Sequence, residues 1–302
     1  MDAVVEVVER YRHELEDAMQ TIRQSGEEYG QSAQQMIQET RNQVEPQTQE
    51  LITAVRDTSS VPPTTKPVVE VFAWATLMIF FANAGIIVGS YILGPLLSAF
   101  LGKSGAALLA FLAIPGYAHY SITKVGYVSA LSDILNSGGG DDAAIRFQVL
   151  SLAIVQGVLM GFVINSLYLS SIPFAVLTPA ITALSFPAVA LSANGNRVAL
   201  LAGTIGAAII FNFAVGLVTV NLSFTYFLLS LTYGGIAAAV MQLIFKNLHE
   251  EAKGHVYQNA LSCGFIIAKG TFFLLFGSYE QEGLVHLLLA GGVPYNQTQL
   301  KF

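Results

Sequence analysis

Long apolar runs separated by short polar breaks fill the chain after residue 66, whereas the residues before them are polar. A helix needs about 20 mostly apolar residues to cross the hydrocarbon core of a bilayer. Runs of this length predict six transmembrane helices and a weaker seventh, which carries Lys269 near its middle. The predicted spans are Val71–Leu93, Leu96–Pro115, Phe147–Leu169, Ile172–Ser192, Val198–Val220, Phe224–Phe245 and Asn259–Gly277.

The polar N-terminal segment predicts a helical arm. Apolar or aromatic residues recur every seven positions, at Val8, Leu15, Ile22, Tyr29 and Met36. That spacing is typical of an amphipathic helix or of a coiled coil, and both interpretations stay open. We therefore expect an all-α membrane protein, a bundle of six to seven transmembrane helices with this N-terminal arm. The expected divisions are a cytosolic helical arm at 1–66, a multi-pass transmembrane domain at 67–277 and a C-terminal tail at 278–302.

The composition supports a membrane protein, and the charges predict its orientation. Of the 302 residues, 53% are hydrophobic and 11% are charged, whereas soluble domains carry about 25% charged residues. The predicted breaks on the N-terminal side of the membrane, here called side A, hold Lys and Arg, and those on the opposite side, side B, hold none. This bias predicts that side A is cytosolic. The side-A cations are Arg56, Lys66, Lys124, Arg146, Arg197, Lys246 and Lys253.

The predicted spans contain no carboxylates. Neither Asp nor Glu occurs at 71–132, 143–249 or 252–279. Intramembrane carboxylates are typical of proton relays and cation pathways, so their absence argues against an ion-coupled transporter and against an intramembrane aspartyl protease. No basic block indicates a nucleic-acid partner, and we expect no cofactor, no metal site and no enzymatic activity.

Two glycine-containing motifs have packing or catalytic interpretations. Gly157 and Gly161 form a small-xxx-small pattern, which lets transmembrane helices approach closely. Gly102-Lys103-Ser104-Gly105 is similar to the Gly-x-Ser-Gly of rhomboid proteases. That chemistry needs a histidine within reach of the serine hydroxyl, and no histidine is central in a predicted span, so a protease of this type is a minor alternative.

Isolated polar side chains inside the spans are candidates for a narrow polar path through the bundle. Taken singly, each is more often a hydrogen-bond partner between helices than a ligand. The candidates are Asn83, Asn165, Asn212, Tyr233, Gln242 and Lys269.

Several short motifs follow one another along the membrane region. Val71-Phe72-Ala73 and Phe81–Gly85 lie in the first span, Gly157–Gly161 in the third, and Met241–Ile244 with His249-Glu250 at the end of the sixth. Their order resembles the Bax inhibitor-1 family, the transmembrane Bax-inhibitor-motif proteins, from about Thr64 to Leu275. The chain would be a divergent member, because the intramembrane acidic residues of that family are missing.

The resemblance implies a function and a compartment. It implies seven helices in the endoplasmic reticulum membrane and a role in negative regulation of apoptosis or in endoplasmic reticulum calcium homeostasis. The expected partners are the lipid bilayer and proteins that bind the arm or the bundle. A calcium leak channel, with Ca²⁺ as the transported ion, is the first alternative and the rhomboid-type protease the second.

Overall fold

A computed structural model describes residues 48–62, 64–123, 140–169, 171–248 and 254–279. The chain divides into two units, Met1–Arg56 and Asp57–Phe302. In the first unit, residues 48–56 form a helix. The heptad positions from Val8 to Met36 and the tail at 280–302 lie outside the described residues, so the coiled-coil arm and the division at residue 66 stay predictions.

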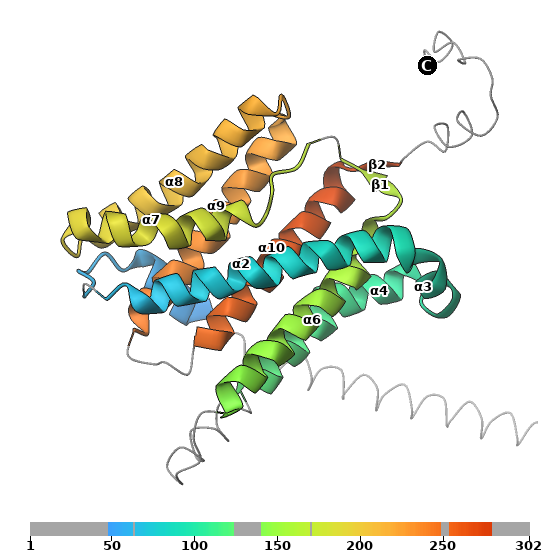
Figure 1. The fold of residues 1–302 in the computed structure, drawn as a ribbon, viewed down its shortest axis with the longest axis horizontal. Coiled ribbons are helices and arrows are strands. Elements are labelled where there is room, and N and C mark those ends of the chain that lie inside the picture. The colour runs from blue at the N-terminus through green and yellow to red at the C-terminus, as the bar shows by residue number, and fades with distance from the viewer. Residues whose placement is uncertain (1–47, 63, 124–139, 170, 249–253, 280–302) are drawn as a thin grey trace, which may run out of the picture. The chain divides into compact units, whose positions relative to one another are not determined.

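The second unit is a bundle of helices (Figure 1), and the expectation of an all-α membrane bundle is confirmed. Its elements follow one another in the order α2 (Lys66–Ile87), η1 (a π-helical turn, Val88–Ile92), α3 (Gly94–Phe100), α4 (Lys103–Leu108), η2 (π-helical, Leu109–Ala113), α6 (Gly140–Ile164), β1 (Leu167–Tyr168), α7 (Leu177–Ala193), α8 (Arg197–Val218), α9 (Phe224–Lys246), α10 (Gly254–Phe276) and β2 (Ser278–Tyr279).

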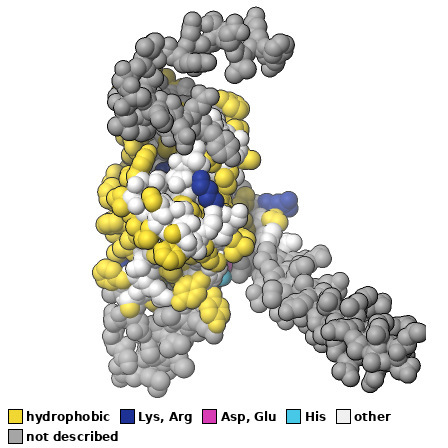
Figure 2. All heavy atoms as spheres, turned by 90° about the vertical axis from the view of Figure 1, so that its right-hand side faces the viewer, with side chains coloured by type: hydrophobic (Ala, Val, Ile, Leu, Met, Phe, Trp, Pro, Cys, Tyr) yellow, Lys and Arg dark blue, Asp and Glu magenta, His cyan; other side chains and the backbone are white. Residues whose placement is uncertain are grey.

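Six helices of the described part are long and apolar enough to cross a membrane. They are Lys66–Ile92, Lys103–Thr123, Ala144–Ile164, Arg197–Val218, Phe224–Lys246 and Gly254–Phe276. At about 1.5 Å per residue, the 17 residues of α7 extend over about 25 Å, which is near the lower limit for a span. Hydrophobic side chains also cover much of the described surface (Figure 2), as expected for a bundle in contact with lipid tails.

The bounds predicted for the second span, Leu96–Pro115, are wrong. The short helix α3 ends at Phe100, Leu101 is extended, and the span begins at Lys103 after the extended Gly102. Proline is tolerated in the first turn of a helix, so Pro95 opens α3, whereas Gly102 makes the break. Lys103 consequently lies on side B, where its Nζ donates to Ser166 Oγ at 2.7 Å, and side B is not free of cations.

The predicted fourth span, Ile172–Ser192, begins too early. Residues 172–174 are not helical, and α7 starts at Leu177, because Pro173 lacks the N–H that a helix interior needs and disfavours helical backbone before it. Pro187, by contrast, lies inside α7. The predicted seventh span, Asn259–Gly277, corresponds to a longer helix that begins five residues earlier, at Gly254.

Glycines let α2 and α6 pack at backbone contact. A Cβ added to Gly157 would lie 2.2 Å from the carbonyl oxygen of Ala82, and one added to Gly161 would lie 2.1 Å from that of Ile86. Gly89 meets the carbonyl oxygen of Val158 from the other side, at 2.0 Å. The spacing of Gly157 and Gly161 thus produces the close packing of helices that the sequence predicts.

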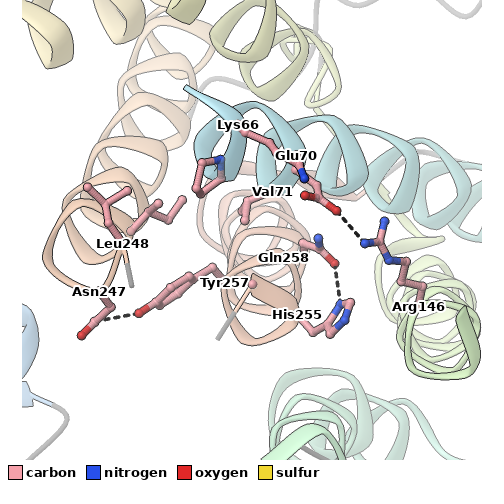
Figure 3. Close-up of a pocket in the computed structure, with 12 residues that line it drawn as sticks. Lys66, Glu70, Val71, Arg146, Asn247, Leu248, His255, Tyr257 and Gln258 are labelled. Carbon is pink, nitrogen blue, oxygen red and sulfur yellow. Dashed lines mark hydrogen bonds and ion pairs between the residues drawn. The ribbon is translucent and has the colours of Figure 1, made fainter. Parts of the chain in front are cut away.

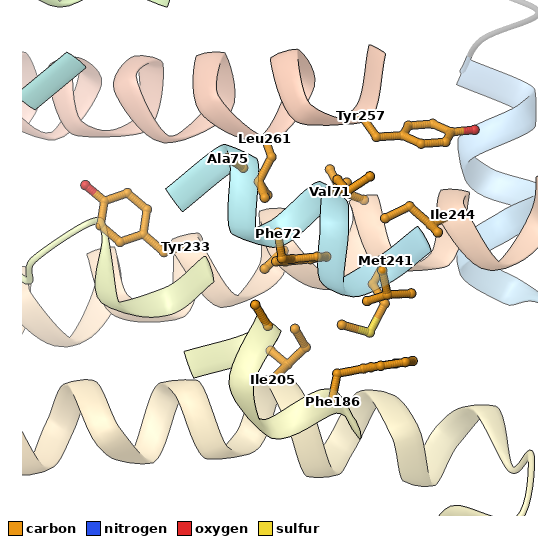
Figure 4. Close-up of a cluster of buried hydrophobic side chains, with 14 of the residues drawn as sticks. Val71, Phe72, Ala75, Phe186, Ile205, Tyr233, Met241, Ile244, Tyr257 and Leu261 are labelled. Carbon is orange, nitrogen blue, oxygen red and sulfur yellow. The ribbon is translucent and has the colours of Figure 1, made fainter. Parts of the chain in front are cut away.

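A core of buried aromatic and aliphatic side chains joins α2 to α7, α8, α9 and α10 (Figure 4). Phe72 of α2 lies near its centre, with Phe186 of α7 and Met241 of α9 in the same cluster. The ring of Tyr233 stacks on Phe265, with centroids 4.4 Å apart. A second core cluster lies among α2, α4, α6 and α10.

The two ends of the bundle are defined by contacts between distant segments. On side A, residues of α2, α6, α9 and α10 line one pocket. On side B, β1, which follows α6, pairs antiparallel with β2, which follows α10, through Leu167–Tyr279 and Tyr168–Ser278. The helix α10 therefore runs from side A to side B and ends beside the end of α6.

Candidate functional site

A pocket of about 320 Å³ opens at the side-A end of the bundle (Figure 3). We call it the side-A pocket. Its walls come from the start of α2, the first turns of α6 and α10, and the end of α9. The lining residues are Lys66, Pro67, Glu70, Val71, Arg146, Ile244, Asn247, Leu248, Gly254, His255, Tyr257 and Gln258.

An ion pair joins two helices across this pocket. The Arg146 guanidinium of α6 donates to Glu70 of α2, with 2.6 Å between Nη2 and Oε1. The same guanidinium lies over the Trp74 ring, 5.0 Å from its centroid. Glu70 and Trp74 are four residues apart on α2, and residues at that spacing share one helix face. The pair therefore orients the arginine head at the pocket wall.

Neutral polar groups cover the opposite wall, which α10 and α9 provide. His255 Nδ1 and Gln258 Oε1 are 3.1 Å apart, and both side chains are buried. Asn247 Nδ2 donates to the Tyr257 hydroxyl at 2.7 Å. These bonds link the end of α9 to the start of α10, and they give the pocket hydrogen-bonding groups on the wall that faces the ion pair.

A short strap, residues 57–61, lies across the turn between α7 and α8 on side A. Val61 N–H donates to the Gly195 carbonyl at 2.9 Å, and Gly195 has φ +78°, which favours glycine. The Asp57 carboxylate pairs with Arg197, whose Nη1 also donates to the Asp57 carbonyl at 3.1 Å. The guanidinium of Arg197, only 3% exposed, lies 5.5 Å from the centroid of the Phe245 ring.

The electrostatics of the strap follow from its hydrogen bonds. The backbone N–H of Ser59 donates to Asp57 Oδ1 at 2.9 Å. That bond, the Ser59 hydroxyl and the Arg197 guanidinium lower the pKa of the Asp57 carboxyl from its ordinary 3.8 to about 2. Asp57 is therefore ionised at neutral pH, as the buried Arg197 cation requires.

Two members of the predicted polar set come together between α2 and α10. Lys269 Nζ donates to Asn83 Oδ1 at 2.6 Å, across 186 residues of sequence. Asn83 in turn donates to the Ile79 carbonyl of its own helix at 2.8 Å. Among the residues that the structure describes, Lys269 forms no ion pair.

The other members of the polar set lie apart from this pair. Asn212 of α8 is fully buried and donates to Thr178 Oγ1 of α7 at 2.8 Å. The Tyr226 hydroxyl donates to the Asn212 carbonyl at 2.8 Å, so these bonds join three helices. Tyr233 is fully buried beside Phe265, and within the described residues its hydroxyl has no hydrogen-bond partner.

Gln242 and Asn165 lie near opposite ends of the bundle. Gln242 is buried about one turn before the end of α9, on side A. Asn165 directly follows α6 and lines a second pocket on side B, together with Lys103. The contacts therefore link Asn83 to Lys269 and leave the other four in separate places, and the polar path stays a prediction.

The sequence analysis did not identify the side-A pocket as a site. Lys66 and Arg146 entered it only as cations that set the orientation. The ion pair of Glu70 with Arg146 spans 76 residues of sequence, and the bond of Asn247 to Tyr257 depends on the close approach of α9 and α10. The one available signal was the position of both cations beside predicted span ends on the same side.

The candidate chemistry of the site is binding. Within the described ranges, no group of three His, Cys, Asp or Glu side chains could hold a metal ion. Ser104 of the rhomboid-like motif is in the first turn of α4, and His119 lies 15 residues further along the same span. At about 1.5 Å per residue this separates them by roughly 22 Å, so His119 cannot act as the base for Ser104.

Comparison with known families identifies a match over almost the whole chain. A family model described as Interactor of ZYG-11 matches residues 1–279. Neither the curated proteins nor the solved structures gave a match.

The family match shows that the resemblance to the Bax inhibitor-1 family is wrong. The functions inferred from it, regulation of apoptosis or calcium, fall with it, and so do the calcium leak and rhomboid alternatives. The motifs that suggested it were short and apolar, and the packing of any transmembrane helix favours such residues. The resemblance also excluded the N-terminal arm, which the family match includes.

Proposed function

Because the chain belongs to the Interactor of ZYG-11 family, we propose that it is a multi-pass membrane protein that binds a ZYG-11 protein on side A. The observation that carries this proposal is the extent of the match, which covers the polar arm as well as the bundle. We propose binding rather than catalysis as its activity. The endoplasmic reticulum stays a prediction that no comparison tests.

The distribution of polar surface favours side A as the place of contact. The flanks of the bundle carry apolar side chains that suit lipid tails, among them Phe100, Leu191 and Val218. On side B the described connections are short, for example the five residues between α8 and α9. Side A carries the arm of 56 residues, the strap and the side-A pocket. A water-soluble partner would find most of its accessible polar surface there.

The positions of the cations support a cytosolic side A. Arg146 and Arg197 lie at the side-A ends of α6 and α8, and Lys246 is in the last turn of α9. Lys103 is the cation that the corrected second span adds to side B. An excess of Lys and Arg on one side of the membrane is typical of the cytosolic face. The partner would therefore be met in the cytosol.

A binding measurement with purified proteins tests the proposal. The full chain, in nanodiscs, is immobilised and titrated with a ZYG-11 protein. We expect saturable binding that the double substitution Leu15→Asp with Ile22→Asp weakens roughly tenfold or more, which is about 1.4 kcal/mol, because both residues lie on the apolar stripe of the arm. The control, Gln20→Asp with Gln24→Asp, adds the same charge to the same helix away from that stripe and should bind like the unmodified chain.

Two results would contradict the proposal. Absence of saturable binding by the full chain would remove the partner. Equal weakening by the stripe and control pairs would show a general charge effect in place of a contact through the arm.

A further inference from the structure

We infer that the side-A pocket binds a phosphate-bearing anionic group, carried by a lipid headgroup or by a soluble phosphate ester. This inference does not depend on the proposed protein partner, because it concerns the bundle and not the arm. It rests on the charges, the donors and the dimensions of the pocket, and on its place at the membrane surface.

The formal charge of the pocket is positive. Lys66 and Arg146 contribute two positive charges and Glu70 one negative charge, so the lining residues sum to one positive charge with His255 neutral. The carboxylate of Glu70 is already held by Arg146 Nη2 at 2.6 Å. Guanidinium has five N–H donors in a planar fork and binds phosphate oxygens in pairs. Arg146 can therefore serve Glu70 and a phosphate at the same time.

The two cations come from different walls, which allows them to hold one anion between them. Lys66 is exposed at the start of α2, and Arg146 is oriented on α6 by Glu70 and Trp74. In Figure 3, His255 and Gln258 of α10 lie below the Glu70–Arg146 pair, and Lys66 lies above them. An anion between these walls would meet charged groups from α2 and α6 and neutral donors from α10.

The helix termini at the pocket partly reinforce this charge. Both α2 and α10 begin there, and neither has an acidic residue in its first turn. A helix N-terminus carries a partial positive charge. The end of α9 contributes the opposite partial charge, and Lys246 in its last turn counters it. These are minor contributions beside Lys66 and Arg146.

Pocket size and lining suit a small headgroup better than a large ligand. The volume of about 320 Å³ lies at the lower end of the range of ligand pockets, about 300–1,000 Å³. Val71, Ile244 and Leu248 add apolar surface beside the polar groups, which suits the carbons next to a phosphate. Basic pockets between transmembrane helices at the cytosolic face are typical sites for anionic headgroups.

The test uses the full chain in phosphatidylcholine nanodiscs. One arm adds a phosphatidylinositol monophosphate to the bilayer, a second adds phosphatidylserine, and a third adds soluble inositol phosphate to the buffer. Bound molecules are counted by native mass spectrometry, and apparent affinities come from titration. Binding only in the first arm assigns the site to a lipid, and binding in the third assigns it to a soluble phosphate ester. Either assignment supports the inference.

Substitutions at the pocket give predictions of opposite sign. Lys66→Gln should weaken binding roughly tenfold, as should the neutral pair Glu70→Gln with Arg146→Gln, because each removes a hydrogen bond from a charged donor. Glu70→Gln alone should strengthen binding, since it removes the only carboxylate of the pocket. Lys103→Gln, which neutralises a cation on side B, is the matched control and should change nothing.

Three results would overturn the inference. They are equal binding of phosphatidylserine and the phosphorylated lipid with no response to Lys66→Gln, equal losses for Lys66→Gln and Lys103→Gln, and weaker binding after Glu70→Gln in a chain that keeps its thermal stability. The first two would indicate general attraction of anions to the protein, and the third would indicate that Glu70 acts only through folding.

Discussion

At the scale of single residues, two cations that are largely removed from water are compensated differently. Arg197 has the carboxylate and carbonyl of Asp57 and the face of Phe245. Lys269 has the amide oxygen of Asn83 at 2.6 Å. A neutral acceptor offsets less of the loss of hydration of a cation than a carboxylate does. The two sites should therefore respond differently to substitution.

The first prediction concerns Asp57→Asn. Since the pKa of Asp57 falls from 3.8 to about 2 on folding, its contribution to stability is complete above pH 3.8 and is lost as the pH falls toward 2. At neutral pH the variant should unfold at a lower temperature than the unmodified chain, because Arg197 keeps its charge without a counterion. Thermal unfolding in detergent at several pH values measures the difference, which should shrink between pH 3.8 and about 2. Ser60→Ala, an exposed change next to Ser59, is the control, and a difference that persists undiminished to pH 2 would contradict the assignment.

The second prediction is a double-mutant cycle on the pair between α2 and α10. Asn83→Leu should lower stability by about 2 kcal/mol, because it removes the acceptor of a hydrogen bond from a charged group. Lys269→Met should not lower it, since the charge that needs the acceptor is gone. In the Lys269→Met background, Asn83→Leu should have little effect. Unfolding in mixed micelles measures all four proteins, and additive losses would show that the two residues act independently.

At the scale of elements, the packing of α2 against α6 is the tightest contact between helices that the glycines report. Gly157 and Gly161 meet backbone carbonyl oxygens of α2, and a backbone atom cannot turn away as a side chain can. Gly206 of α8 contrasts with them, because a Cβ there would meet nothing within 4 Å. These glycines are equivalent in the sequence but not in the fold.

The third prediction uses that contrast. Gly161→Ala should lower stability by about 3 kcal/mol, because the added methyl overlaps the Ile86 carbonyl and separates the helices. Gly206→Ala, the matched control, should leave stability unchanged or raise it by about 0.5 kcal/mol, since alanine favours the helix more than glycine does. Thermal unfolding of both variants provides the comparison, and similar losses would mean that α2 and α6 are not in backbone contact.

The apolar pattern could predict the helices because bilayer thickness sets a minimum length for any run that crosses it. It could not predict the start of the second span. The Gly94-Pro95 break and the Gly102 break look alike in a sequence, but Pro95 is accommodated in the first turn of α3. The side-A pocket was beyond prediction for another reason: Glu70 and Arg146 are each ordinary residues at a span end, and only the packing of α2 on α6 brings them to 2.6 Å.

At the scale of the whole molecule, the direction of α10 decides where the chain leaves the membrane. The helix begins beside the side-A pocket and ends where β2 pairs with β1 on side B. Lys269, which made this span doubtful from the sequence, is accommodated by its bond to Asn83. With α7 crossing as well, the chain makes seven crossings and its two termini lie on opposite sides of the membrane.

The fourth prediction tests this topology. Asn296 begins an acceptor sequence for N-glycosylation, Asn296-Gln-Thr298. If side A is cytosolic, a protein expressed in microsomes should carry a glycan there that endoglycosidase removes and that Asn296→Gln abolishes. A tag at the N-terminus should be digested in sealed microsomes, and one at the C-terminus should be protected. Digestion of both tags would place the termini on the same side and contradict seven crossings.

The strap at 57–61 has a mechanical consequence. It lies between the arm and α2, and it is fastened to the α7–α8 turn by Val61 on Gly195 and by Asp57 on Arg197. Tension applied to the arm would therefore load that turn before it reached Lys66 and the first helix. A force that pulled on the N-terminus would first detach the strap and expose Arg197, while the backbone contact of α2 with α6 stayed closed. The strap would act as a mechanical fuse between the arm and the rest of the bundle.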